Sequence, residues 1–253
     1  MEIRERAELF RNDRVTKPPR AVLFDFGGTL YDYQTLAAGD RESLRLLAEL
    51  AGAHCEPEVV QRAHRAALRR VFQGYLTRDF YLHRDMFRDA VVEMLRELGA
   101  EAAPEHLERY RESQWKSHQR DFRLRDGVPE TLGELRRRGL RLGIVSNIDD
   151  DQLRHLGELA GLDRYFDWLL SSETAGSCKP HGGIFAEALR RAECEPEEAL
   201  FVGDSLSQDI AGANRAGLRS VLLWHRADRD PPIDGERPAH VIRKIPDVLE
   251  LVS

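Results

Sequence analysis

The chain has 253 residues, of which 42% are hydrophobic and 32% are charged, and its formal net charge is −6. That length gives enough apolar residues for one large or two modest globular units. An acidic chain is a poor ligand for nucleic acid or for an anionic membrane, so we expect neither as a partner. No segment approaches the roughly 20 apolar residues that a membrane-spanning helix needs.

The three cysteines, Cys55, Cys178 and Cys194, are scattered without the spacing of a metal site. An odd number without a pattern is typical of a reducing compartment rather than of a disulfide framework. The N-terminus is charged and has no apolar signal region. We therefore expect a cytoplasmic protein, and the sequence leaves open whether it is a monomer or a homodimer.

The first part of the chain predicts a tail, a strand and then a block of helices. Residues 1–19 are polar and end in two prolines, which indicates a tail outside the fold. Residues 21–26 form an apolar run, as in a strand covered on both faces. Between 36 and 120 apolar residues recur with helical period, and glycines and prolines mark the breaks. That block predicts about four antiparallel helices.

After Gly127 the pattern alternates between strands and helices, which predicts a parallel α/β sheet with right-handed crossovers. The expected elements are a helix at 128–138, a strand at 140–145, a helix at 150–160, a strand at 168–170, a helix at 184–193, a strand at 200–202, a helix at 208–216, a strand at 221–223, and a last strand and helix at 241–242 and 245–252.

Four polar segments follow expected strands: Asp25–Thr29, Ser146–Asn147, Lys179 and Asp204–Asp209. The carboxyl ends of parallel strands line one crevice, so we expect these segments to meet there. Carboxylates gathered without enough basic partners need a cation, and hard oxygen ligands suit Mg²⁺. The pattern predicts a Mg²⁺-dependent enzyme that acts on phosphate.

Phosphoryl transfer needs a nucleophile and neutralisation of the phosphate charge. Asp25 is the candidate nucleophile, since carboxylates form covalent intermediates of this kind. Ser146 and nearby N–H groups can bind phosphate oxygens, and Lys179 supplies a positive charge. Asp204 can bind Mg²⁺ directly, and Asp209 can bind it through water.

Together these segments resemble the motifs of the haloacid dehalogenase superfamily, most of whose members are phosphohydrolases. The resemblance covers about residues 20–253. It implies a Rossmann-like core domain at 20–35 and 121–253, with helices on both faces of a parallel sheet, and an inserted all-helical cap domain at 36–120. It also implies a metal site formed by Asp25, the Gly27 carbonyl, Asp204 and Asp209, and a phosphate site formed by Gly28, Thr29, Ser146, Asn147 and Lys179.

Gly27 departs from the family's pattern, because phosphatases of this family usually have an aspartate there that protonates the leaving oxygen. Loss of a general acid typically costs on the order of 10²–10⁴ in rate. Tyr31 or Asp32, which follow the first motif, could replace it, whereas His181 is better interpreted as a surface histidine in a loop. Similarly, the cluster Arg78, His83 and Arg84 could bind an anionic substrate tail or form a solvated face.

We interpret the chain as a phosphatase of a small phosphorylated metabolite. Two alternatives stay open. A 2-haloacid dehalogenase needs no leaving-group acid, which suits Gly27, but the acid pair Asp204 and Asp209 argues against it. The other alternative is a catalytically weakened scaffold that serves as a binding protein.

Overall fold

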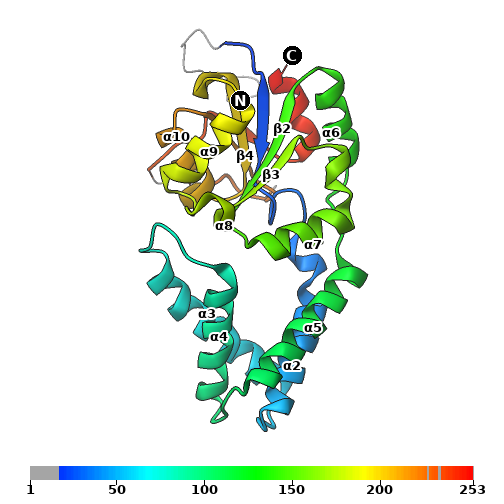
Figure 1. Cartoon of the computed structure of the whole chain (residues 1–253), viewed down its shortest axis with the longest axis vertical. Coiled ribbons are helices and arrows are strands. Elements are labelled where there is room, and N and C mark those ends of the chain that lie inside the picture. Colours follow the sequence, from blue (N-terminus) through cyan, green and yellow to red (C-terminus); the bar gives the residue numbers. More distant parts are fainter. Residues whose placement is uncertain (1–16, 227, 233–234, 253) are drawn as a thin grey trace.

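A computed structural model describes residues 17–226, 228–232 and 235–252. The fold is built on six parallel strands in the order β3-β2-β1-β4-β5-β6 (Figure 1). The strands are β1 (Ala21–Phe24), β2 (Arg141–Ser146), β3 (Trp168–Ser171), β4 (Ala199–Gly203), β5 (Arg219–Leu223) and β6 (His240–Ile242). The order steps outward from β1 in both directions, so the ends of β1, β2 and β4 share one edge.

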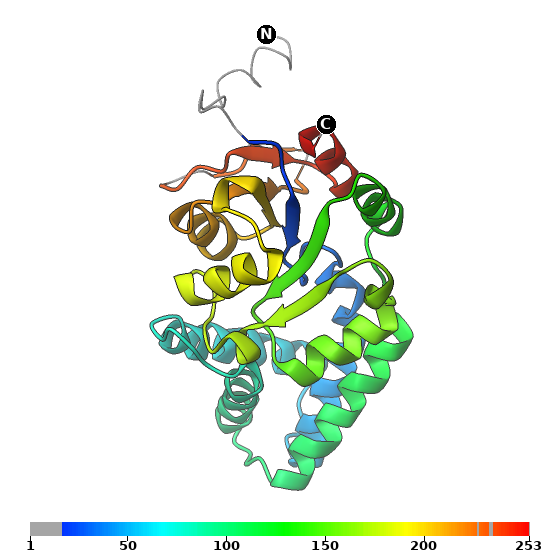
Figure 2. The same cartoon turned by 45° about the horizontal axis from the view of Figure 1, so that its top comes forward.

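Helices cover both faces of the sheet, as expected from the doubly buried strands (Figures 1 and 2). Val22 and Phe24 of β1 belong to the cluster under α6 (Val128–Arg137), α7 (Asp150–Ala160) and η5 (Ile245–Val252). Ala21 and Leu23 belong to the cluster under α9 (Gly182–Ala192) and α10 (Ala211–Arg215). The alternation of strand side chains thus fills two apolar layers from one short strand. The predicted fold class is confirmed.

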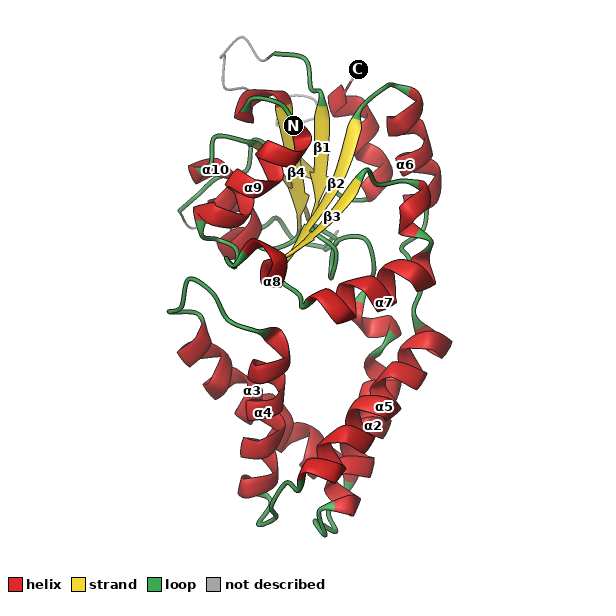
Figure 3. Ribbon diagram, viewed as in Figure 1, coloured by secondary structure: helices red, strands yellow, loops and turns green. Residues whose placement is uncertain are grey.

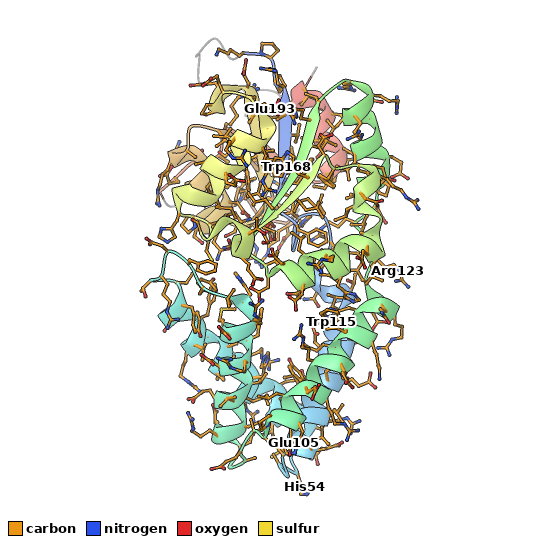
Figure 4. The ribbon with its side chains drawn as sticks, in the orientation of Figure 1. His54, Glu105, Trp115, Arg123, Trp168 and Glu193 are labelled. Atoms are coloured by element: carbon orange, nitrogen blue, oxygen red, sulfur yellow. The ribbon has the colours of Figure 1, made fainter. Side chains whose placement is uncertain are left out.

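Residues 36–121 form four helices and no strand: α2 (Ala37–Leu50), α3 (Pro57–Tyr75), α4 (His83–Glu97) and α5 (Pro104–Asp121). Figure 3 shows them apart from the strands, with α2 packed along α5 and α3 along α4. Figure 4 places His54 and Glu105 at the end of this helical insert that lies farthest from the sheet. The four expected helices are present, whereas the assignment of residues 36–120 to a separate cap domain stays a prediction.

Local structure differs from the sequence prediction at several ends. Strand β1 stops at Phe24, two residues early, and β2 extends to Ser146. The helix expected at 208–216 begins as a π-helical turn, η4 (Leu206–Ile210), before α10. The last segment, η5, is a 3-10 helix. Most of the predicted tail, residues 1–16, lies outside the described residues.

Short helices complete the connections: η1 (Tyr33–Thr35), η2 (Leu162–Arg164), α8 (Ser172–Ala175) and η3 (Pro196–Glu198). No helix in the described ranges is long and apolar enough to cross a bilayer.

A buried carboxylate joins the helical insert to the sheet. Asp149, the residue before α7, is 2% exposed and accepts hydrogen bonds from the backbone N–H groups of His83 (2.8 Å) and Arg84 (2.5 Å). These are the first two residues of α4, whose N–H groups have no partner within their own helix. The Arg84 guanidinium also makes two hydrogen bonds to Glu173 of α8, at 2.7 and 3.0 Å. The start of α4 is therefore held by the sheet half of the molecule.

We expect Asp149→Ala to lower the free energy of unfolding by about 2 kcal/mol, because it leaves two buried N–H donors without a partner. Urea denaturation measures the effect. The matched control is Asp151→Ala, which removes an exposed ion pair with Arg111 that also bridges α7 and the insert. That change should cost less than about 0.5 kcal/mol. Equal losses in the two variants would contradict the role given to Asp149.

Candidate active site

Three carboxylates meet at the edge where β1 and β4 end. Asp25 follows β1, Asp204 follows β4, and Asp209 lies in η4. The pairing of Phe24 with Val202 brings the two strand ends into register. One oxygen from each of the three carboxylates lies within 4.8 Å of the other two. Segments separated by almost 180 residues thus meet, as the sequence motifs predict.

Lys179 enters this cluster from the loop before α9. Its Nζ donates hydrogen bonds of 2.6 Å to Oδ1 of Asp25 and to Oδ1 of Asp209, and the residue is only 3% exposed. Burial alone would lower the lysine pKa, but the carboxylates of Asp209 and Asp25 outweigh it and raise that pKa above its usual value. The lysine is therefore charged, and the alternative of a surface lysine is wrong.

The single positive charge of Lys179 does not neutralise three carboxylates. Burial, followed by the charges of Asp25 and Asp209, raises the pKa of Asp204 to about 7. Burial also raises the pKa of Asp209 to about 6, although Lys179 acts in the opposite direction. Burial is the largest cause of both raised pKa values, and the charge of Asp25 adds to it in each case, so ionised carboxylates are unfavourable here. Clustered carboxylate oxygens of this kind fit a hard divalent cation such as Mg²⁺.

Two glycines follow Asp25, and each has a physical reason. A Cβ added at Gly27 would overlap the hydroxyl oxygen of Tyr33 and lie 3.1 Å from that of Tyr31. The space of the missing acid is therefore occupied by a tyrosine. Gly28 has φ +86°, and an added Cβ would lie 2.5 Å from Oδ2 of Asp204. Only glycine suits that backbone conformation and that close approach.

Two residues expected to bind phosphate instead support the loop of Asp25. Thr29 is fully buried, and its hydroxyl donates to Oδ2 of Asp25 at 3.0 Å. The Gly28 N–H donates to the carbonyl of Tyr31 at 2.9 Å, so that donor already has a partner. Neither residue lines the pocket above the acids. The donors of both residues are bonded to neighbouring protein atoms, and their direct contact with phosphate stays a prediction.

The two residues of the second motif, Ser146 and Asn147, also have different roles. Ser146, the last residue of β2, lines the pocket and is 4% exposed. Asn147 accepts a hydrogen bond from the Lys179 N–H at 2.7 Å and donates one to the Lys179 carbonyl at 3.0 Å. It lines the pocket too, but its amide group is used to fix the backbone that carries the lysine.

The pocket has a volume of about 410 Å³. It brings together most of the predicted site residues: Asp25, Gly27, Ser146, Asn147, Lys179, Asp204 and Asp209. The candidate replacement Asp32 does not line it, because its carboxylate bonds to the Gln34 N–H and to Arg125. His181 does not line it either and lies 3.2 Å from Asp79.

The insert supplies the opposite wall, of which sequence reasoning identified only His83, as part of a polar cluster. This wall consists of Phe72, Tyr81, His83, Met86 and Phe87. Its members at 86 and 87 fit the helical period of α4, so the sequence indicated only that they face an apolar core. Nothing in the sequence distinguishes this pair, because α4 also contains the adjacent apolar pairs Ala90–Val91 and Met94–Leu95, and all four of those residues are buried in the core. Met86 is 3% exposed, whereas Phe87 is 43% exposed.

Comparison with known proteins agrees with the motifs. A family model described as haloacid dehalogenase-like hydrolase matches residues 19–217. The human haloacid dehalogenase-like hydrolase domain-containing protein 3 is 32% identical over 82% of this chain and 84% of its own length. Glyceraldehyde 3-phosphate phosphatase of Methanopyrus kandleri is 32% identical over 92% of this chain and 97% of its own length. The chain therefore belongs to the haloacid dehalogenase-like hydrolase family.

Solved structures support the same fold. The HAD-hydrolase YfnB of Bacillus subtilis, determined with bound magnesium, superposes with a TM-score of 0.75 and 24% identity. The match covers 94% of this chain and all of that one. At this identity the similarity shows the fold alone.

The excess negative charge makes a stability prediction. The pKa of Asp204 in the folded protein, about 7, lies above its ordinary 3.8, so its ionisation destabilises the fold as pH rises from about 4 to 7. We expect Asp204→Asn to raise the free energy of unfolding of the metal-free protein by about 1–3 kcal/mol at pH 8. The gain should vanish near pH 4.5, where the wild-type carboxyl is protonated in the folded state.

Urea denaturation in EDTA at both pH values measures this effect. Asp79→Asn is the control, because the Asp79 side chain is 86% exposed and its removal should leave stability almost unchanged. A loss of stability at pH 8 in Asp204→Asn would contradict the charge excess.

Proposed function

We propose that this hydrolase is a Mg²⁺-dependent phosphatase of small phosphate monoesters that works through an aspartyl-phosphate at Asp25. The observation that carries the proposal is the convergence of Asp25, Asp204 and Asp209 around the buried Lys179 on the floor of a pocket. Phosphatases among the relatives, such as that of Methanopyrus kandleri, support the reaction class.

The donor set suits the metal. Asp25, the Gly27 carbonyl and Asp204 would bind Mg²⁺ directly, and Asp209 through water, because Asp209 already accepts hydrogen bonds from Lys179 and the Ser205 N–H. Bound there, Mg²⁺ would supply the positive charge that offsets the carboxylates and the incoming phosphate dianion. Lys179 and Ser146 would bind phosphate oxygens from the protein side.

The reaction needs two displacements at phosphorus. In the first, an Asp25 oxygen bonds to phosphorus while the bond to the substrate oxygen breaks, and the leaving oxygen departs with its electron pair. In the second, water attacks the phosphorus of the aspartyl-phosphate, which releases inorganic phosphate and restores the Asp25 carboxylate. Thr29 and Lys179 fix both oxygens of Asp25 before the attack, so little reorganisation is needed.

Gly27 determines which leaving groups are favoured. Its position has no carboxyl group to protonate the departing oxygen. The hydroxyl of Tyr31, a candidate replacement that does line the pocket, lies beside Gly27, but burial raises the pKa of Tyr31 and makes it a weak acid. Alcohols of low pKa, such as phenols, tolerate this best, and aryl and acyl phosphates should react faster than alkyl phosphates.

Neither alternative function gains a specific observation. A dehalogenase has no use for three clustered acids, and the charge excess around Lys179 favours a metal site. A mere binding protein would not need Asp25 held by both Thr29 and Lys179. We propose that the helical insert, residues 36–120, acts as the cap, because it supplies the wall that faces the acids.

Hydrolysis of p-nitrophenyl phosphate should require Mg²⁺. We expect EDTA to reduce the rate at least about 100-fold and added Mg²⁺ to restore it. Asp25→Asn should lose roughly 10³-fold or more in kcat, because the amide is a poor nucleophile. Asp32→Asn is the control, since this nearby carboxylate faces Arg125 and not the pocket. Unchanged activity in EDTA would eliminate the mechanism.

Restoring an acid at position 27 should help poor leaving groups selectively. We expect Gly27→Asp combined with Tyr33→Ala, which frees the occupied space, to raise the ratio of alkyl to aryl phosphate turnover about tenfold or more. Steady-state kcat/KM with both substrates measures that ratio, and Tyr33→Ala alone is the control. If the double variant leaves the ratio at the control value, the missing side chain at Gly27 does not limit the leaving group.

A further inference from the structure

The wall that faces the acids is apolar and mostly aromatic. Phe72 comes from α3, Tyr81 from the loop before α4, and Met86 and Phe87 from α4. Tyr81 and Met86 are 6% and 3% exposed, so their side chains are fixed by packing. A leaving group attached to a phosphate on the floor of the pocket would contact this wall.

Positive charge is almost absent from the pocket. Lys179 is the only lysine or arginine among the described residues that line it, and its Nζ is bonded to Asp25 and Asp209. His83 also lines the pocket, but burial, together with the charge of Lys179, lowers its pKa to about 4. The imidazole is therefore neutral at pH 7 and offers hydrogen bonding without charge.

The nearby arginines that could bind an anionic tail are turned elsewhere. Arg84 is bonded twice to Glu173, and the guanidinium of Arg78 lies over the ring of Tyr75 at 4.1 Å. Neither lines the pocket. The hypothesis that these arginines grip an anionic substrate tail is therefore wrong for this arrangement, and only His83 of the predicted cluster reaches the pocket.

A second cavity of about 460 Å³ shares Phe87 and Gln152 with the first, so it adjoins the same wall. Its arginines are already paired with carboxylates. Arg111 bonds to Asp151, and Arg88 lies 2.9 Å from Asp85. The third arginine that lines it, Arg84, is bonded to Glu173, and Asp40, Glu108 and Asp149 line it as well. A longer leaving group that reached this cavity would therefore meet more carboxylates than arginines.

We propose that the substrates are phosphate monoesters whose leaving group is uncharged and apolar, with an aromatic ring as the best fit. This inference rests on the proposed phosphatase function and names its substrate class. A second carboxylate or phosphate on the leaving group would lose its hydration against Phe72, Tyr81, Met86 and Phe87 without gaining a cation.

Two aryl phosphates that differ in one charge test the inference. They are 4-(2-carboxyethyl)phenyl phosphate and its methyl ester. In both compounds two methylene groups separate the carboxyl or ester group from the ring, so the two phenol leaving groups have almost the same pKa. With Mg²⁺ present, we expect kcat/KM for the ester to exceed that for the acid about tenfold or more. Equal rates, or preference for the acid, would overturn the inference and leave the phosphatase function standing.

A positive charge introduced into the wall should reduce the preference for the ester over the acid. Phe87 is 43% exposed, so Phe87→Arg should fold, and we expect it to narrow the gap between ester and acid at least about fivefold. Leu76→Arg is the matched control, because Leu76 is 45% exposed on the same insert but does not line the pocket, and its selectivity should stay at the wild-type value. An unchanged gap in Phe87→Arg would overturn the placement of the leaving group against this wall. If neither aryl phosphate is hydrolysed by the wild type or by any variant, the phosphatase function itself is overturned, and the inference falls with it.

Discussion

The site depends on an electrostatic imbalance that the fold imposes. Asp25, Asp204 and Asp209 repel one another at a strand edge. Among the described residues that line the pocket, Lys179 is the only lysine or arginine, and it bonds to two of these carboxylates. Such a cluster costs stability unless further positive charge arrives. The packing of the sheet and its helices offsets this loss of stability and holds the strand ends in place. Carboxylate repulsion in the metal-free site favours the binding of a cation, which relieves that repulsion and makes room for the negative charge of a phosphate.

Small residues make this crowding possible. A Cβ at Gly28 would press on Asp204, and one at Gly203 would overlap the side chain of Asp209. Asp209 lies within the π-helical turn η4, and its carboxylate accepts a hydrogen bond from the Lys179 Nζ. Inserted π-turns of this kind often occur at functional sites, where they re-aim a side chain. Backbone geometry, as much as residue identity, therefore defines the position of the acids.

The sequence was sufficient for the parts of the molecule that repeat a pattern. Short apolar runs identify the strands, and the polar motifs that follow several of them identify the carboxyl edge where Asp25 and Asp204 meet. The partners within that edge could not be read in this way. Thr29 and Asn147 have the composition of phosphate ligands, yet their hydrogen bonds go to Asp25 and to the Lys179 backbone. Residue type predicts what a group can bind, whereas only the packed structure determines which neighbour reaches it first.

The insert was harder to interpret for a related reason. Apolar residues at helical spacing look the same whether they face a core or a substrate pocket, so Met86 and Phe87 of α4 carried no functional signal in the sequence. The apolar character of these side chains favours the same substrates as the missing acid at Gly27, on the opposite side of the pocket. Without an acid at Gly27, the favoured leaving groups are those that depart as stable anions, and phenols are the common class. Phenols are also the leaving groups that an aromatic wall without free cations accepts most easily. Two segments some 60 residues apart, one in the first motif and one in the insert, therefore favour the same kind of substrate.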